Sequence, residues 1–284
     1  MTRIDLHCHS TASDGTLTPA ELVRAGAAAG LDVMAITDHD TTGGWAEAAE
    51  ARPEGLSLVR GAELSCRWRG GPRWPIALHL LAYLFDPDEP RLAADLARLR
   101  DDREQRAEQI VDLLRADGVP ISWAEVHEYA AGGSVGRPHI AQALIRAGLV
   151  ATTTEAFQSG WLGGRYFVPK SDLDVFEGVR AVRAAGGVPV FAHPRATKRG
   201  PVVPDSLVEE LAEAGLFGLE ADHEDHSPAE RAEMRALADR LGLVVTGSSD
   251  FHGTHKTVQL GAFVTSPEAY EKIAAAATGV AVLG

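Results

Sequence analysis

Short runs of apolar and β-branched residues recur along this 284-residue chain, and segments with helix-capping residues separate them. We expect these runs to form seven strands, at residues 3–6, 31–40, 57–65, 76–84, 187–194, 216–222 and 243–250. Strands that alternate with helices are typical of a parallel α/β fold. The pattern therefore predicts an α/β barrel with one strand fewer than the usual eight.

The segments between these strands carry helix signals. Thr18, Pro19 and Glu21 form a capping box with proline at the first helical position, and Gly30 is placed to end that helix. Further helices are expected at residues 42–51, 175–185, 205–214 and 227–241. Each of them follows a predicted strand or the central segment described next.

The alternation stops between residues 90 and 171, where no convincing strand is found. This segment contains a long charged helical run at 91–116, a helix opened by Ser122 and Glu125, and short helices at 138–147 and 153–159. The simplest interpretation is a helical insertion after the fourth strand. We therefore predict a discontinuous barrel domain, residues 1–89 and 172–284, and an insertion subdomain, residues 90–171.

Composition limits the location and the partners of the protein. A formal net charge of −13 argues against the broad positive surface that binds long nucleic acids. Two cysteines, Cys8 and Cys66, with no signal peptide and no apolar run of spanning length, favour a cytoplasmic protein without membrane contact. An anionic substrate would have to be bound locally, by metal ions or by a few arginines.

The stretch IDLHCHSTASDG places two histidines around a cysteine at the end of the first strand. Residues two apart in a strand share a face, so His7 and His9 project together and Cys8 points the other way. The two imidazoles can reach one ion, although histidine pairs also occur by chance. Cys8 and Cys66 are expected to be buried apolar side chains rather than ligands.

Other side chains that bind metals stand at or near the carboxyl ends of the predicted strands, where barrel enzymes build their active sites. The whole set is His7, His9, Asp14, His39, Glu63, His79, His193, Asp250 and His252. These are too many ligands for one ion, and their nitrogen and oxygen donors suit zinc, manganese or iron. Adjacent ions about 3.5 to 4 Å apart can clamp both oxygens of a phosphoryl ester. The set therefore predicts phosphoester hydrolysis.

The motifs DLHCHSTASDG, AITDHDT, GAELS, LHLLAY, AHP and SSDFH resemble, in order, those of the PHP (polymerase and histidinol phosphatase) family. The resemblance covers nearly the whole chain and implies a distorted seven-stranded TIM-like barrel with three divalent ions. It assigns His7, His9, Glu63 and Asp250 to the first ion and Glu63, His79 and His193 to the second. Asp14, His39 and His252 would bind the third. We expect manganese, with iron, zinc or magnesium as alternatives.

The segments SVGRPHIAQAL and YFVPKSD are similar to one branch of this family. That branch removes the 3'-phosphate from nucleoside 3',5'-bisphosphates and trims short 5'-phosphorylated RNA from its 5' end. The resemblance implies that the insertion covers the active site and that Arg137, His139, Lys170 and Arg195 bind substrate phosphates. Arginine can grip phosphate oxygens bidentately, whereas lysine offers a point charge.

Two other functions stay open, a histidinol phosphatase acting on a smaller monoester and a noncatalytic or polymerase-associated binding module. The remaining polar residues receive simpler interpretations. Asp38 is a candidate to hold a ligand histidine. Lys198 and Arg199 are expected to be solvated, and surface positions are expected for Asp40, His127, His223, His226 and His255.

Overall fold

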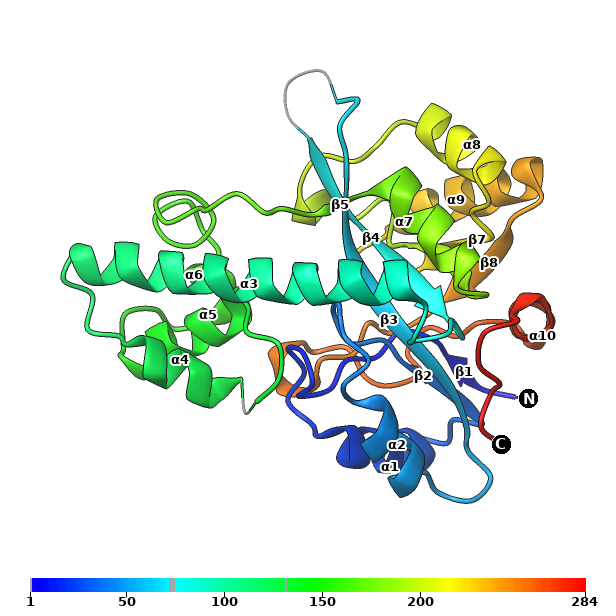
Figure 1. The fold of residues 1–284 in the computed structure, drawn as a ribbon, viewed down its shortest axis with the longest axis horizontal. Coiled ribbons are helices and arrows are strands. Elements are labelled where there is room, and N and C mark those ends of the chain that lie inside the picture. The colour runs from blue at the N-terminus through cyan, green and yellow to red at the C-terminus, as the bar shows by residue number, and fades with distance from the viewer. Residues whose placement is uncertain (1, 72–74, 131) are drawn as a thin grey trace.

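The computed structural model describes residues 2–71, 75–130 and 132–284. Within this part of the chain, the seven predicted strands form one curved sheet in the order β1-β2-β3-β4-β6-β7-β8. Their bounds are β1 Ile4–Asp5, β2 Val33–Ile36, β3 Ser57–Trp68, β4 Ile76–Tyr83, β6 Val188–Ala192, β7 Gly218–Asp222 and β8 Val244–Gly247. The predicted α/β barrel is confirmed (Figure 1).

Backbone hydrogen bonds just beyond β1 and β8 bring the two edges of the sheet together. His9 N donates to Phe251 O at 2.9 Å, and Phe251 N donates to His7 O at 3.3 Å. The sheet is therefore a nearly closed barrel, and the segment HCH lies on the seam. This position places His7 and His9 beside the residues that follow β8.

The barrel is distorted because β4 runs antiparallel to both of its neighbours, β3 and β6. The simple alternation expected from the sequence is wrong at this point, since β3 and β4 pair as a long antiparallel ladder. A two-residue strand, β5 Leu173–Asp174, also pairs with β3 and returns the chain from the insertion to the sheet. Two residues are too few to give a strand pattern in the sequence.

The helices that pack around the sheet lie close to their predicted positions. They are α1 Pro19–Ala28, α2 Trp45–Ala51, α7 Val175–Ala184, α8 Asp205–Glu213 and α9 Pro228–Leu241. Capping boxes begin α1 at Thr18 and α9 at Ser227, where each cap stabilises its helix by about 1 kcal/mol. One helix was not anticipated, α10 Pro267–Ala276, which Ser266 caps and which buries Ala269 and Ile273. None of the described helices is long and apolar enough to cross a bilayer.

The segment after β4 is helical, with α3 Pro90–Ala116, α4 Trp123–Tyr129, α5 Arg137–Arg146 and α6 Thr153–Ala156. Helix α3 runs from the strands of the barrel to α4, α5 and α6 (Figure 1), and its side chains belong to two hydrophobic cores. Its first half buries Leu92, Leu96 and Leu99 with the helices and sheet of the barrel. Its second half packs Ile110 and Leu114, among others, against α4, α5 and α6. One long helix thus connects the barrel to a second, smaller core.

Candidate metal centre and adjoining basic group

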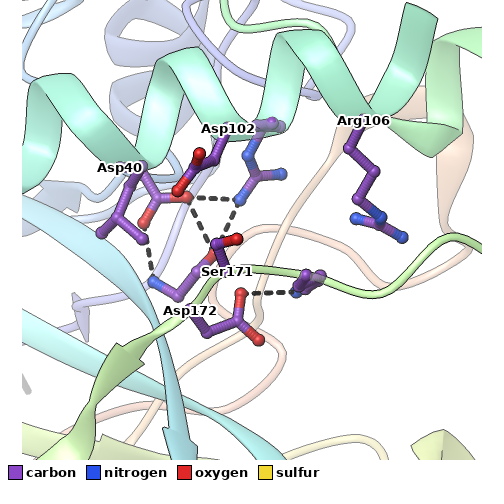
Figure 2. A pocket seen from close by; sticks show the side chains of 9 residues that line it. Asp40, Asp102, Arg106, Ser171 and Asp172 are labelled. Atoms are coloured by element: carbon purple, nitrogen blue, oxygen red, sulfur yellow. Dashed lines mark hydrogen bonds and ion pairs between the residues drawn. The ribbon is translucent and has the colours of Figure 1, made fainter. Parts of the chain in front are cut away.

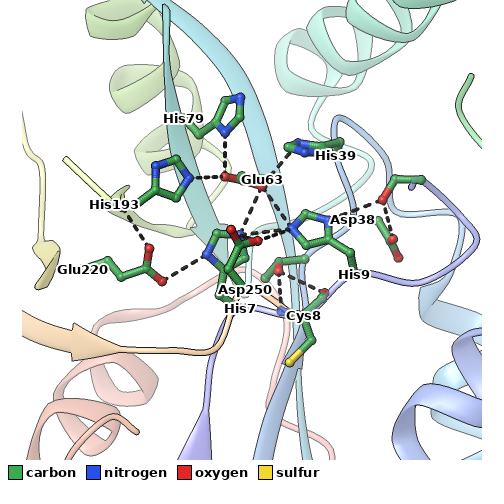
Figure 3. A network of polar contacts seen from close by, with 12 residues as sticks. His7, Cys8, His9, Asp38, His39, Glu63, His79, His193, Glu220 and Asp250 are labelled. Carbon is green, nitrogen blue, oxygen red and sulfur yellow. Dashed lines mark hydrogen bonds and ion pairs between the residues drawn. The ribbon is translucent and has the colours of Figure 1, made fainter. Parts of the chain in front are cut away.

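The predicted metal-binding side chains from the strand ends meet at one end of the barrel (Figure 3). Their donor atoms form three overlapping groups, in which all atoms of a group lie within 4.8 Å of one another. The groups are His7, His9, Glu63 and Asp250; His9, Asp14, His39 and His252; and His39, Glu63 and His79. His193 joins them through Nε2, which lies 3.1 Å from Glu63 Oε1. We call these nine residues the histidine-carboxylate cluster.

Glu63 is the centre of the cluster. Its Oε2 lies 3.1 Å from Nε2 of both His7 and His9, and 3.3 Å from His39 Nδ1. Its Oε1 lies 2.8 Å from His79 Nδ1 and 3.1 Å from His193 Nε2. One buried carboxylate thus faces a different set of imidazoles with each oxygen, which is the arrangement of a carboxylate that bridges two ions.

His79 reaches the cluster by a route that differs from the one expected. It lies in the amino half of β4, not near the carboxyl end. Because β4 is antiparallel to β3 and β6, its amino half lies at the barrel end where the parallel strands have their carboxyl ends. The reversed strand direction explains why this side chain still contacts Glu63.

Some nitrogen and oxygen atoms of the cluster that could bind a metal ion make no hydrogen bond. Within the described residues, Asp250 Oδ1, His39 Nδ1 and His79 Nδ1 are buried and make none. Buried polar atoms are normally paired, and an unpaired one is costly. The backbone is also strained at His193, with φ 32°, and at Asp250, with φ 52°. Unpaired imidazole and carboxylate donors, held by strained backbone, fit divalent cations.

Burial and crowding set the charge of the cluster. Burial lowers the pKa of His7, but Glu63 and then Asp250 raise it well above its usual value. Burial also lowers the pKa of His9, and the nearby carboxylates of Asp250 and Glu63 raise it to about 9. Burial raises the pKa of the Glu63 carboxyl, but His79 and then His7 bring it well below its ordinary range. The Glu63 carboxyl is therefore ionised at neutral pH, and its negative charge favours a cation.

Glu220 on β7 orients two members of the cluster, a role that the sequence reasoning missed. Its Oε1 accepts a hydrogen bond from His7 Nδ1 at 3.0 Å, and its Oε2 accepts one from His193 N at 2.8 Å. Its partner His7 therefore presents Nε2 to the cluster. The available signal was a carboxylate between Leu219 and Ala221 in an otherwise apolar strand.

Asp38 acts on the cluster through intervening serines. It accepts hydrogen bonds from Ser10 N at 2.8 Å and from Ser13 Oγ at 2.7 Å. Ser13 Oγ lies 3.4 Å from His9 Nδ1. The carboxylate therefore fixes the loop that carries His9 without contacting the imidazole in a direct hydrogen bond.

Several residues expected at the surface are buried, so those predictions were wrong. Asp40 is covered by α3, where Arg103 Nη2 donates to its Oδ2 at 2.6 Å. His223 lies behind the cluster, with Nε2 3.2 Å from Asp250 Oδ2, and the buried His226 accepts a hydrogen bond from Arg195 N. A sequence pattern does not reveal which loops a later element covers.

The surface prediction is confirmed for His127, whose side chain is 48% exposed. Lys198 is also exposed, as expected. The side chain of His255 lies outside the described residues. Arg199 is exposed as well, but it was not expected to contact the cluster, where its Nη2 donates to Asp250 Oδ2 at 2.7 Å.

A group of cations lies close to Asp40, the residue after His39, and Figure 2 shows the pocket in which Arg106 of this group faces Asp172 and Asp40. Arg103 and Arg106 come from α3, Arg137 begins α5, and Lys170 precedes β5. We call these four side chains the basic group.

Contacts of Arg103 connect the basic group to the cluster. Arg103 Nη2 donates to Asp40 Oδ2 and, at 2.9 Å, to Ser65 Oγ. Asp40 follows His39 in the chain, and Ser65 pairs with His79 across the β3–β4 ladder. The basic group therefore adjoins the ligands on this side of the barrel.

The four cations of the basic group are only partly paired with carboxylates. Burial lowers the pKa of Lys170 to about 8; Asp172 opposes this shift, and Arg103 and Arg137 add to it. Lys170 Nζ is 3.8 Å from Asp172 Oδ1, which is too long for a hydrogen bond. Arg106 donates through Nε to Val168 O, but its buried Nη2 makes no hydrogen bond within the described chain. Arg103 is paired with Asp40 and Lys170 lies near Asp172, whereas Arg106 and Arg137 form no ion pair within the described residues.

The other predicted phosphate ligands are held by the protein. The Arg137 guanidinium lies 5.1 Å from the centre of the Phe157 ring, at the edge of the basic group. His139 is buried, and its Nδ1 accepts a hydrogen bond from Gly136 N at 3.0 Å. Arg195 donates to Val203 O at 2.8 Å and pairs with Asp205, which orients its guanidinium toward the start of α8.

Comparisons with known proteins agree with this site. The PHP domain model matches residues 5–120. A 5'-3' exoribonuclease of Haemophilus influenzae is 34% identical, and the aligned region covers 91% of this chain and 93% of the relative. A 3',5'-nucleoside bisphosphate phosphatase of Chromobacterium violaceum is also 34% identical, over 89% of this chain and 88% of the relative.

The fold is also known from a solved structure, a protein of Bifidobacterium adolescentis assigned as a metal-dependent phosphoesterase. It superposes with a TM-score of 0.92 at 35% identity, covering 98% of this chain and 97% of that one. The chain belongs to the PHP family. It is an enzyme of the class that hydrolyses phosphoric esters with divalent metal ions.

Proposed function

We propose that the protein removes the 3'-phosphate of nucleoside 3',5'-bisphosphates and also trims short 5'-phosphorylated RNA from its 5' end. The observation that carries this proposal is the basic group beside the histidine-carboxylate cluster. A substrate with two phosphates can place one at the cluster and the other at the basic group. A monoester such as histidinol phosphate has no second phosphate to satisfy these cations.

We assign three divalent ions to the cluster, with manganese as the expected metal. His7, His9, Glu63 and Asp250 hold the first, and Glu63, His79 and His193 hold the second. Asp14, His39 and His252 hold the third. The unpaired donor atoms of Asp250, His39 and His79 support this assignment. Bound ions supply positive charge to the phosphoryl oxygens and make water more acidic.

The side chains around the ions orient the reaction. In the hydrolysis, a bond forms between water oxygen and phosphorus while the bond from phosphorus to the 3' oxygen breaks. The ribose oxygen leaves with a proton that water supplies, so the products are a nucleoside 5'-monophosphate and inorganic phosphate. Glu220 keeps His7 Nε2 directed at the cluster throughout, and Glu63 remains an acceptor for both sides.

We assign the second phosphate to the basic group, with Arg137 and Lys170 as its principal ligands and Arg103 and Arg106 beside them. His139 supports this site by fixing the start of α5, where its ring accepts the Gly136 N–H. Arg195 would bind phosphate only after leaving Asp205. Bidentate arginines and a lysine suit a terminal phosphate.

We also propose that residues 90–171 form a subdomain that covers the active site of a barrel made of residues 1–89 and 172–284. The second core under α3 supports this division. Ser134 N donates to Ala12 O at 2.9 Å, which connects the segment to the loop that carries Asp14. A groove between them is lined by Glu47, Asp101 and Glu104, and these carboxylates disfavour a long RNA strand.

A substrate panel with manganese tests the function. It contains adenosine 3',5'-bisphosphate, adenosine 3'-monophosphate, short 5'-phosphorylated RNA, histidinol phosphate and an aryl phosphate. We expect kcat/KM to be highest for the bisphosphate, followed by the RNA. Faster hydrolysis of histidinol phosphate would identify a histidinol phosphatase instead. Lack of turnover on the whole panel, with no bound transition metal, would support a noncatalytic module.

A further inference from the structure

Arg199 contacts the histidine-carboxylate cluster at two of its residues, His193 and Asp250. It ends the short 3-10 turn η1 Thr197–Arg199, which follows β6. Its Nη2 donates to Asp250 Oδ2 at 2.7 Å, and its Nη1 lies 3.1 Å from His193 Nε2. Its Nε donates to Asp225 Oδ2 at 2.7 Å. One guanidinium thus joins two cluster residues and an outer carboxylate.

The contact with His193 is one that a bound ion would replace. Arg199 can only donate, so His193 Nε2 must accept, and it does so with the lone pair that would bind an ion. The same nitrogen is 3.1 Å from Glu63 Oε1, and it cannot also donate there while it accepts. If His193 and Glu63 hold an ion, His193 Nε2 would no longer accept from Arg199, and Arg199 Nη1 would be free for another acceptor.

The contact with Asp250 is also replaceable. Asp250 Oδ2 has two further partners, Lys256 Nζ at 2.6 Å and His223 Nε2 at 3.2 Å. This oxygen therefore stays paired when Arg199 Nη2 moves. The Nε contact with Asp225 lies on the outer side and does not involve the cluster. Asp225 can therefore hold the side chain in place while both Nη atoms turn to a new acceptor.

We propose that Arg199 binds the phosphoryl group that is hydrolysed and that Asp225 positions it. This inference rests on the proposed phosphatase function, because it assigns a ligand to the phosphate at the cluster. The two Nη atoms of Arg199 lie beside His193 and Asp250, which are assigned to different ions. A phosphoryl group bound to both ions would bring its oxygens close to these Nη atoms. A planar guanidinium there contacts two of those oxygens and neutralises the charge that grows on them in the transition state.

Neighbouring cations do not share these features. Lys256 donates to both Asp250 Oδ2 and the Asp250 backbone oxygen, so it is tied to one residue. Lys198, adjacent in η1, is exposed and provides a matched control. The Arg199 side chain is 35% exposed, which leaves it accessible to a substrate that enters the cluster.

The test measures phosphate binding and metal binding separately in Arg199→Ala, Arg199→Lys, Asp225→Asn and the control Lys198→Ala. We expect Arg199→Ala to lower kcat/KM for the bisphosphate and the 3'-monophosphate by about 100-fold. Competitive inhibition by inorganic phosphate should weaken about 10-fold, which is the loss of one charge-assisted hydrogen bond. Manganese affinity, from calorimetry, should stay the same or rise, because a competing cation has been removed.

The variants distinguish substrate binding from structural support. Arg199→Lys should recover part of the phosphate affinity, Asp225→Asn should weaken phosphate less than Arg199→Ala, and Lys198→Ala should match the wild type. If manganese affinity and kcat/KM fell together in both Arg199→Ala and Arg199→Lys, the inference would be overturned. Such a result would show that Arg199 stabilises the metal-binding residues and does not bind the phosphate. Unchanged phosphate inhibition would also overturn it. A wild-type enzyme inactive on the substrate panel would instead refute the proposed function.

Discussion

The histidine-carboxylate cluster and the basic group are neighbours with opposite construction. The cluster is built on strands and strand ends, where Glu63 and Asp250 are almost fully buried among histidines. The basic group is built on α3, α5 and the loop before β5, where Lys170 and the arginines lie close together and Asp40 and Asp172 pair with part of their charge. The first site is made mainly of histidines and carboxylates, and the second mainly of arginines and a lysine.

This difference separates two tasks within one substrate. Rigid strands and orienting groups such as Glu220 hold the metal-binding side chains in fixed positions, which hydrolysis at the bound ions requires. The helical segment supplies charge that selects a substrate with a second phosphate. If the division holds, substitutions in the cluster should affect every phosphoester, and substitutions in the basic group should affect only bisphosphates and 5'-phosphorylated RNA.

The largest effect is expected at the shared carboxylate of the cluster. Glu63→Gln keeps the size of the side chain but removes the charge that faces His7 and His79. Turnover of every substrate in the panel should fall below detection, and manganese content should drop in elemental analysis. The exposed Glu50→Gln should retain both properties. Retention of full manganese content by Glu63→Gln would contradict its bridging role.

A smaller and selective effect is expected in the basic group. Arg137→Ala should raise KM for adenosine 3',5'-bisphosphate by about 10- to 100-fold, the cost of a charge-assisted contact. It should leave 3'-monophosphate hydrolysis unchanged, because that substrate has no second phosphate. Arg165→Ala is a control, since this exposed arginine pairs with Asp117 on the same segment. An equal fall in kcat/KM for both substrates would show that Arg137 stabilises the histidine-carboxylate cluster and does not bind the second phosphate.

Glu220 offers a way to weaken the cluster without removing a ligand. Glu220→Gln removes the charge that stabilises the orientation of His7 and changes the acceptor for His193 N. Manganese affinity should fall about 10-fold or somewhat more, the usual range for such orienting carboxylates. Saturating manganese should restore most of the activity. Calorimetric titration that gives wild-type affinity would show that His7 needs no such partner.

The sequence predicted the barrel strands because buried strands are apolar over several residues and are bounded by helix caps such as Thr18 and Ser227. It did not predict that β4 runs antiparallel, since a hydrophobic pattern has no direction. The nine cluster residues were found because polar side chains at the ends of apolar strands are conspicuous. They lie close together because the strands of the barrel bring their ends to the same place. The expected position of His79 near the carboxyl end of β4 was wrong, but the antiparallel direction of β4 still places this residue at the end of the barrel where the other ligands lie.

Residues that act through tertiary contact were not predictable in the same way. Glu220 lies within a strand, and Arg199 lies in a loop whose composition is typical of solvent exposure. Asp40 and His223 are covered by parts of the chain far from them in sequence. Propensity and spacing describe local structure, whereas these roles depend on which loop another element happens to cover.

The smallest expected effect is a pH dependence confined to the basic group. The pKa of Lys170 is lowered by burial to about 8, so the ammonium is present below pH 8 and is lost as the pH rises above it. Because only the protonated form attracts phosphate, KM for the bisphosphate should rise between pH 7 and 9, to several-fold at pH 9. Lys170→Arg keeps a positive charge at these pH values, so it should remove this rise. The 3'-monophosphate serves as the internal reference, because titration of the cluster would change its KM as well. A rise common to both substrates, and unaltered in Lys170→Arg, would assign the pH dependence to the cluster and not to Lys170.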